Sequence, residues 1–208
     1  MDKTATWYRR LYQWYEVSWL YNLHQLVMDP GRGPAVRRFL KNVPYQSVID
    51  IGCGTGNWAH LAHGRYLGVD GSPSFIAACE RRFCDDPQKN FTCADVRSLR
   101  VSEPYDLALL MSVLHHLSDD QAVQLVSWVA QNAHYFLILD MYPIHWNPLS
   151  RLLYAMDRGN YIREPEQQAA LVWRNPAMEL VKADSFYSWN PLTRHTLFLF
   201  ESKAAAFR

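Results

Sequence analysis

The residues best suited to chemistry lie where an apolar segment, 47–51, runs into alternating glycines at Gly52, Gly54 and Gly56. Glycine lets a turning backbone approach a ligand closely. We expect a helix to follow, with its N-terminal N–H groups directed at an anionic group. Asp50, just before the glycines, adds a carboxylate that can hold an ammonium group. Together these features suit an amino-acid zwitterion.

A dinucleotide is the alternative ligand for this motif. Residues 54–59 also fit the pattern G-x-G-x-x-A, and Asp70 follows at about the distance of a ribose-binding acid. Spacing alone therefore leaves both cofactors open. Two acids favour the zwitterion: Asp50 would repel a pyrophosphate, and Asp95 adds a carboxylate after a third apolar segment.

A parallel sheet must position these residues, because strand-like and helix-like segments alternate from residue 47 onward. We expect strands over 47–51, 66–69, 91–94, 105–111 and 135–140. The expected helices cover 5–28, 35–41, the glycines to about 63, 74–83 and 119–132. Segments 184–189 and 195–201, joined by a turn-prone stretch, predict an antiparallel edge hairpin. The predicted fold class is α/β, Rossmann-like and doubly wound, with a mostly parallel seven-stranded sheet and a C-terminal antiparallel hairpin.

With the segment YDLALLMSVLHHL at 105–117, these motifs resemble class I S-adenosylmethionine-dependent methyltransferases. The resemblance runs from about 47 to 140 and continues more loosely to the hairpin. The quoted segment resembles the small-molecule, ubiquinone/menaquinone-biosynthesis-like branch, and MDRGNYIREPE at 156–166 is similar to a segment of small bacterial methyltransferases. One departure is the stretch 130–134, AQNAH, where many relatives have a Pro-Gly-Gly turn.

The resemblance implies S-adenosyl-L-methionine as the cofactor and assigns residues to its parts. Those around the methionine moiety are Asp50, Gly52, Gly54 and Gly56. Asp70 is implied at the ribose hydroxyls, Asp95 and the backbone near Val96 at the adenine, and Met111 and Ser112 near the reacting methyl group. An alternative for Asp95 is to cap the next turn of the chain.

His115 and His116, just past the fourth strand, are the candidate catalytic residues. A sulfonium already activates the methyl group, so the protein mainly positions the reactants and excludes water. A base is needed only where the acceptor must lose a proton, and imidazole titrates near neutrality. The alternatives for both residues are a place in the wall of the site and a helix-capping role.

Aromatic residues make up 14% of the chain and gather in two segments, the expected helix 5–28 and the connection 141–181. Rings and cations together suit an aromatic or lipid-like acceptor with an anionic group. Plain packing and a solvated helix face are the alternatives. The candidate substrate residues are Tyr12, Trp14, Tyr142, Trp146, Arg158 and Arg163.

Size and charge narrow the function classes. A chain of 208 residues with 49% hydrophobic content predicts one domain. Within it we expect an aromatic helical cap (1–45), a donor-binding core (46–140), a lid-like insertion (141–181) and an edge hairpin (182–208). A net charge of +1 argues against nucleic acid as a partner.

Composition also predicts a location. Without a signal-like start or a membrane-spanning apolar run, we expect no stable membrane insertion, a cytoplasmic location and four reduced cysteines. Cysteine spacing suggests no metal site, and nothing in the sequence opposes a homo-oligomer.

These residues predict methyl transfer to a small-molecule acceptor. We expect O-methylation of an aromatic, lipid-like or natural-product compound. N- or C-methylation, a nicotinamide-dependent reductase and a non-catalytic S-adenosylmethionine-binding protein are the alternatives.

Overall fold

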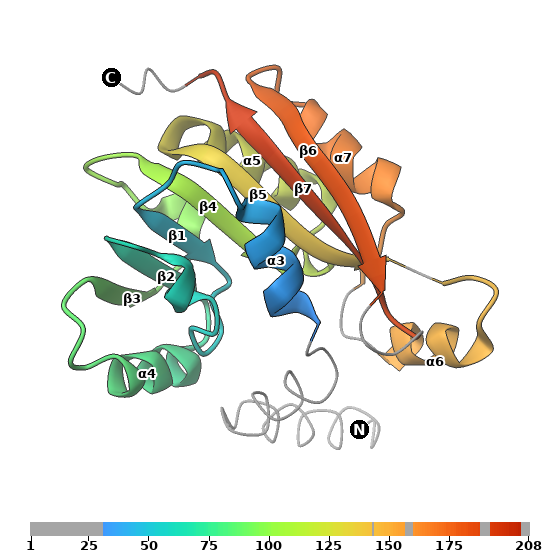
Figure 1. Cartoon of the computed structure of the whole chain (residues 1–208), viewed down its shortest axis with the longest axis horizontal. Helices are drawn as coiled ribbons and strands as arrows, with labels where there is room; N and C mark the ends of the chain where they lie inside the picture. The colour runs from blue at the N-terminus through green and yellow to red at the C-terminus, as the bar shows by residue number, and fades with distance from the viewer. Residues whose placement is uncertain (1–30, 143, 157–159, 188–191, 205–208) are drawn as a thin grey trace, which may run out of the picture.

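The computed structural model describes residues 31–142, 144–156, 160–187 and 192–204. The expected helix 5–28 lies outside this part of the chain. Within it, a central sheet separates two layers of helices (Figure 1). The strands are β1 (Val48–Ile51), β2 (Tyr66–Asp70), β3 (Lys89–Cys93), β4 (Tyr105–Met111), β5 (Ala133–Tyr142), β6 (Met178–Tyr187) and β7 (Arg194–Ser202).

The sheet has seven strands in the order β3-β2-β1-β4-β5-β7-β6. The first five of these pair in parallel, whereas β7 runs antiparallel to both β5 and β6. The predicted α/β class, the mostly parallel sheet and the C-terminal antiparallel hairpin are therefore confirmed. Because parallel strands share a direction, the segments after β1, β2, β4 and β5 meet at one edge, which we call the carboxyl edge.

The two faces of the sheet bury separate hydrophobic clusters, so the central strands are mostly apolar, as β4 shows with its run YDLALLM. Side chains such as Phe136 and Ile138 pack on one face beneath α5 and α7, whereas Leu137 and Leu139 pack on the other beneath α3. The helices are α3 (Arg32–Leu40), α4 (Pro73–Arg82), α5 (Asp119–Asn132), α6 (Pro148–Met156) and α7 (Pro165–Trp173).

The helix expected directly after the glycines is wrong. Residues 52–58 form turns, and only a short 3-10 helix, η1 (Ala59–Leu61), follows. Gly56 has φ of +73°, which a right-handed helix does not allow, and Ala62 is extended. Only five residues lie between these two positions, too few for a stable α-helix.

Other boundaries shift for local reasons. Helix α3 begins at Arg32 instead of 35, because Pro34 lies in its first turn, where the missing N–H is not needed. Strand β6 begins at Met178, so the expected boundary between insertion and hairpin at 181–182 falls inside a strand. The connection after β5 contains α6 and α7 as two separate helices.

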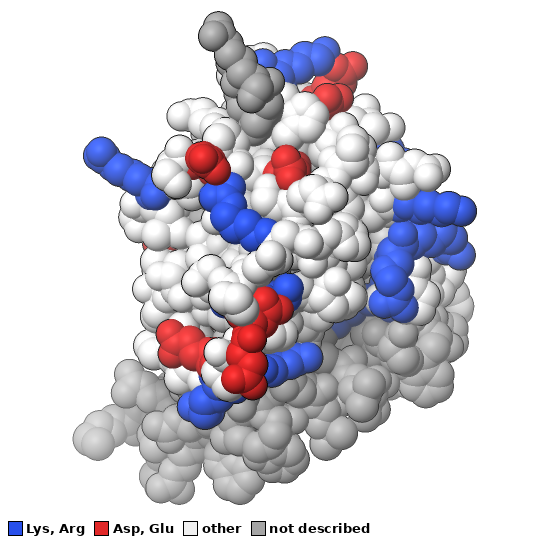
Figure 2. Space-filling model, turned by 60° about the vertical axis from the view of Figure 1, so that its left-hand side comes forward, with Lys and Arg blue, Asp and Glu red and all other residues white. Residues whose placement is uncertain are grey.

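Charges are mixed over most of the face shown in Figure 2, with a group of basic side chains alone along one flank. This agrees with the net charge of +1. None of the helices in the described ranges combines the length and the apolar character that a bilayer crossing requires.

Candidate functional site

The glycine-rich loop after β1 turns in the left-handed region of backbone conformation. Gly52, Gly54 and Gly56 have φ values of +71°, +54° and +73°, which residues with a side chain rarely adopt. A Cβ at Gly52 would lie 2.5 Å from Cγ2 of Val113, and one at Gly56 would lie 2.9 Å from Cε2 of Phe83. The packing of the loop itself therefore requires glycine at these two positions.

Backbone N–H groups of this loop are bonded within the protein. Gly52 and Cys53 both donate to the carbonyl of Val69, at 2.7 and 3.1 Å. Gly54 donates to Oδ2 of Asp70 at 2.9 Å. Since no α-helix begins here, the expected helix N-terminus facing an anion is also wrong. The acids around the loop are its main polar feature.

Asp50 is completely buried in β1, beneath the loop. Its Oδ2 accepts a hydrogen bond from the Tyr66 hydroxyl at 2.7 Å, whereas Oδ1 has no partner among the described residues. Burial raises the pKa of Asp50 to about 7; the Tyr66 hydrogen bond lowers it and the charge of Asp70 raises it. A ligand ammonium group at Oδ1 would satisfy this oxygen and favour the ionised carboxylate.

Asp70 ends β2 and faces the same loop. Besides the Gly54 amide at Oδ2, its Oδ1 accepts a hydrogen bond from the Ser72 backbone at 2.8 Å. Each carboxylate oxygen has two lone pairs, so acceptor capacity remains for hydroxyl groups. The carboxylate is also oriented by these two backbone donors.

A cavity of about 280 Å³ opens at the carboxyl edge beside Asp70. Four predicted cofactor residues line it: Gly52, Asp70, Asp95 and Val96. Val113 and Gln121 are among the residues that complete the wall. Sites for whole small molecules usually enclose about 300–1,000 Å³, so this cavity suits a nucleoside-sized group.

Asp95 adopts the capping role that the sequence left as its alternative. Its Oδ1 accepts from the backbone of Arg97 at 3.0 Å, at the start of η2 (Val96–Ser98), and from Nε of the same residue at 2.9 Å. These side-chain hydrogen bonds from Arg97 hold the pKa of Asp95 below its usual value. An adenine contact at Asp95 stays a prediction.

Met111 and Ser112 lie where β4 ends. Ser112 has φ of +59° although it is not glycine, a strained conformation that is frequent at functional sites. Its backbone donates to the carbonyl of Leu139 at 2.7 Å, and its Oγ accepts from Nη1 of Arg32 at 2.7 Å. Arg32 is buried at the start of α3, so the contact ties α3 to the end of β4.

His115 is buried and bonded to Asp140, an acid near the end of β5. Its Nδ1 donates to Oδ1 of Asp140 at 2.5 Å, and its backbone N–H donates to Oδ2 at 3.0 Å. Both side chains are almost fully buried, at 4% and 1% exposure. His116 is exposed, and its ring packs against that of His115 at 4.1 Å between centroids. A catalytic role for either histidine stays a prediction.

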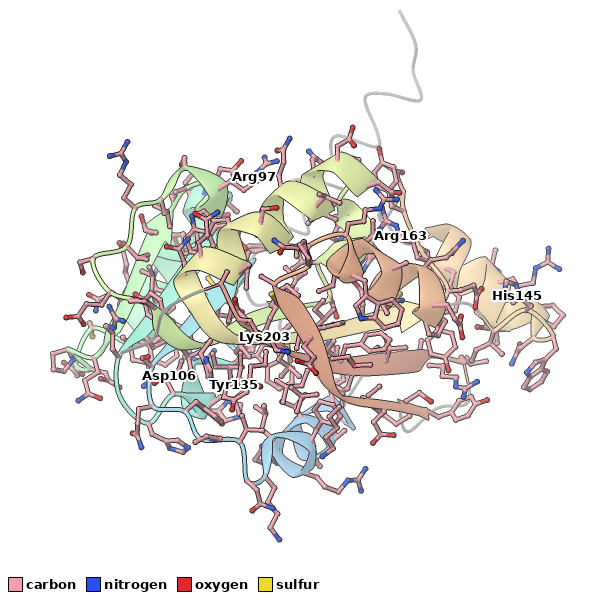
Figure 3. The ribbon with its side chains drawn as sticks, turned by 90° about the horizontal axis from the view of Figure 1, so that it is seen from above. Arg97, Asp106, Tyr135, His145, Arg163 and Lys203 are labelled. Carbon is pink, nitrogen blue, oxygen red and sulfur yellow. The ribbon has the colours of Figure 1, made fainter. Side chains whose placement is uncertain are left out.

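The candidate substrate residues are separated in the structure. Trp146 is 74% exposed and Tyr142 is buried at the end of β5. Arg163 is also buried, between α5 and α7 (Figure 3), where it bonds Asp119 and three backbone carbonyls. These bonds indicate that Arg163 stabilises the fold here. Tyr12, Trp14 and Arg158 lie outside the described residues.

The sequence did not single out three residues that the structure brings to the carboxyl edge. They are Arg32, Asp140 and Arg194. Asp140 is the last residue of the expected fifth strand, and an acid at the carboxyl end of a parallel strand could have been predicted to lie at the site. Arg32 and Arg194 carry no motif, so only the fold places them. In the described part of the chain, no group of three metal-ligating side chains is found.

Comparison with known proteins places a methyltransferase domain at residues 48–133. Trans-aconitate 2-methyltransferase of Methylobacterium nodulans is 41% identical over 80 residues, which are 34% of this chain and 30% of the relative. The Escherichia coli enzyme of the same name is 33% identical over 114 residues, 51% of this chain and 42% of the relative. The chain thus spans less than half the length of these curated relatives.

Solved structures extend the likeness to most of the fold. The N-methyltransferase NodS from Bradyrhizobium japonicum has a TM-score of 0.63 at 14% identity, covering 80% of this chain and 91% of NodS. Magnesium protoporphyrin IX methyltransferase from Synechocystis, solved with bound S-adenosylhomocysteine (SAH), has a TM-score of 0.63 at 16% identity, covering 82% and 81%. The comparisons therefore show a methyltransferase domain at residues 48–133 and, over most of the chain, the fold of these solved methyltransferases.

Proposed function

We propose that this protein transfers a methyl group from S-adenosylmethionine to an oxygen of a small organic acceptor. The buried Oδ1 of Asp50 carries the proposal, because it has no hydrogen-bond partner among the described residues. An unsatisfied buried carboxylate oxygen is costly, and the ammonium group of the donor would satisfy it. The oxygen lies beneath the loop whose glycines the family places around the methionine moiety.

The remaining donor contacts follow from the same geometry. Asp70 keeps acceptor capacity for the ribose hydroxyls, and the cavity lined by Asp95 and Val96 is large enough for a nucleoside-sized group. When bound, the donor supplies a methyl group already activated by a sulfonium. The protein therefore has to orient the donor, hold the acceptor in line and keep water away.

Residues after β4 and β5 are proposed to serve the acceptor. The bond from Arg32 holds the strained Ser112 at the end of β4, and the bond from Asp140 fixes the ring of His115. A carboxylate oxygen needs no base before methylation, whereas a hydroxyl or an amine does. His115 and His116 would therefore act as bases only for an acceptor that is methylated at a hydroxyl or an amine.

Two observations support an acid as the acceptor. The relatives named trans-aconitate 2-methyltransferase take their name from a tricarboxylate, although the match covers mainly the donor half. Cationic side chains also lie at the carboxyl edge, including Arg32. The proposal retains the aromatic, lipid-like or natural-product body expected from the ring-rich segments, now with an anionic group attached.

Mass spectrometry of reaction products tests the proposal. Purified protein is incubated with S-adenosylmethionine and a panel of acids, trans-aconitate among them, together with matched alcohols and amines. We expect a mass increase of one methylene in an acid and equimolar SAH, both reduced by Asp70→Ala when the donor is below saturation. Methylation of amines alone would refute transfer to oxygen. Tight donor binding with no product from any acceptor would favour a non-catalytic binding protein.

A further inference from the structure

Arg194 begins β7 and lies at the outermost row of the sheet's carboxyl edge. It pairs with Tyr142 of β5 on one side and with Tyr187 of β6 on the other. Residues paired across strands share a face of the sheet, so the three side chains form one row on the face that α5 and α7 cover. Asp140 lies on the same face, two residues back along β5.

The guanidinium of Arg194 is held between two aromatic rings. Its carbon lies 4.9 Å from the ring centre of Tyr142 and 5.1 Å from that of Tyr187. Nη2 donates to Oγ of Ser185 at a long 3.3 Å. Nε is buried and has no hydrogen-bond partner among the described residues. Rings can stabilise the charge of a guanidinium, but they leave its N–H donors unused.

An unused, buried Nε–H next to a weakly bonded Nη2 is one side of the arginine fork. A carboxylate binds this side through two parallel N–H···O bonds, which are stronger than neutral hydrogen bonds. The nearby acid Glu164 is bonded instead to His145 at 2.6 Å. The fork therefore matches a carboxylate that comes from outside the described chain.

Tyr187 is the exposed one of the two rings beside the fork. Its side chain is 48% exposed, and exposed side chains change rotamer rapidly. Rotation of this ring would remove its contact with the guanidinium on that side. Tyr142 on the other side is buried and keeps the guanidinium in place.

The fork lies within a short distance of the bonded pair His115 and Asp140. Two residues along a strand correspond to about 7 Å, so the row of Arg194 lies about that far from the row of Asp140. Asp140 bonds the turn that follows Ser112, the residue placed near the reacting methyl group. A small acid held at Arg194 can thus reach toward the donor from β5 and β7.

We propose that Arg194 binds a carboxylate of the methyl acceptor and thereby selects small organic acids with at least two acidic groups, one held and one methylated. That the bound acid is the methyl acceptor rests on the proposed function. Binding of a carboxylate at Arg194 can be tested separately. Tyr142 and Tyr187 position the guanidinium, and Arg194 makes the contact.

Calorimetric titration with tricarballylate, a tricarboxylate, in the presence of SAH tests the site. We expect wild-type protein to bind it and the neutral trimethyl ester to bind at least about tenfold more weakly, because a charge-assisted bidentate pair is lost. Arg194→Gln should weaken tricarballylate binding by a similar factor without altering SAH affinity. Arg194→Lys, which keeps the charge but loses the fork, should fall between the two.

Arg100→Gln is the matched control, because Arg100 is exposed and precedes β4 at the opposite edge. It should bind both ligands as the wild type does. Equal binding of tricarballylate by wild type and Arg194→Gln, or no binding by wild type saturated with SAH, would overturn the proposal. If Arg194→Gln does not fold, the wild-type affinities for tricarballylate and its trimethyl ester decide the question. Equal affinities would overturn the proposal. Absent SAH binding with intact, Arg194-dependent acid binding would refute the proposed function alone.

Discussion

Two halves of the molecule are built in different ways: β1 to β4 with their loops, which we propose to bind the donor and call the donor half, and β5 to β7, which we propose to bind the acceptor and call the acceptor half. In the donor half, contacts join residues that are close in the sequence, as when the backbone of Gly54 donates to Asp70 at the end of the next strand. The contacts of the acceptor half join segments that are distant in the sequence: Asp140 reaches back to His115 of the donor half, and Arg194 packs against Tyr142.

This difference explains what comparison with relatives can show. The methyltransferase domain covers residues 48–133 and ends where β5 begins. A motif of closely spaced residues is readable in any relative that binds the same donor. A site assembled by strand pairing has no such local pattern. We therefore infer that the donor half carries the family's common function and the acceptor half carries specificity.

The largest expected effect is in the donor half. Gly52→Ala places a Cβ 2.5 Å from Val113 at a φ of +71°. We expect the free energy of unfolding to fall by about 3 kcal/mol, because a left-handed residue costs about 1–2 kcal/mol and the overlap adds to it. SAH binding should be lost in calorimetry.

Gly71→Ala is the matched control, since a Cβ there meets nothing within 4 Å. It should change the unfolding free energy little. If both variants unfold alike in urea, the packing argument for the loop fails.

In the acceptor half, Asp140→Asn should cost about 2 kcal/mol of unfolding free energy. The carboxylate accepts from the backbone N–H and the ring Nδ1 of His115 and from the Met141 backbone, and an amide leaves one buried donor without an acceptor. The affinity for SAH should stay within about twofold, since the pair lies outside the donor cavity. A large loss of SAH affinity with intact stability would contradict the division into two halves.

Asp50 predicts a pH dependence that belongs to the donor half. Its pKa is raised to about 7 in the folded protein from 3.8, so between these values the folded state holds a proton that the unfolded state has lost. The free energy of unfolding should therefore fall as pH rises from about 4 to 7, by up to about 1.4 kcal/mol per pH unit, and then level off.

Urea denaturation at several pH values measures this slope. Asp50→Asn, which stays neutral and can still accept the Tyr66 hydrogen bond, should remove the contribution of this group. An unchanged slope in the variant would show that another group is responsible.

The smallest effect is expected at the exposed end of the acceptor half. His145 contacts Glu164 at 2.6 Å, but its side chain is 74% exposed. His145→Ala should change the melting temperature very little, because exposed pairs contribute about 0–1 kcal/mol. A drop as large as that of Asp140→Asn would mean that this surface contact organises the acceptor half.

Strands and helices with strong local signals could be predicted from the sequence. The bounds of β4 and α5 match the expected 105–111 and 119–132, because β4 is an apolar run and α5 begins at a capping box of Ser118 and Gln121. The helix after the glycines could not be excluded locally. Its absence follows from the left-handed Gly56 and the extended Ala62, which leave only five residues between them.

The candidate site was predictable to the same extent. Asp50, Asp70 and the glycines stand in a motif, and the structure brings them together around one loop. The partners of the acceptor half are not spaced in any pattern: Arg194 meets Tyr142 only because β7 is inserted antiparallel beside β5. Long-range register of this kind follows from the whole sheet.

Calorimetric titration of the wild-type protein with SAH tests the central claim most directly. We predict saturable binding at one site per chain, weakened about tenfold by Asp70→Ala, because two ribose hydroxyls lose a charged acceptor. Folded wild-type protein that binds no SAH, or an Asp70→Ala variant with unchanged affinity, would contradict the account of the donor half.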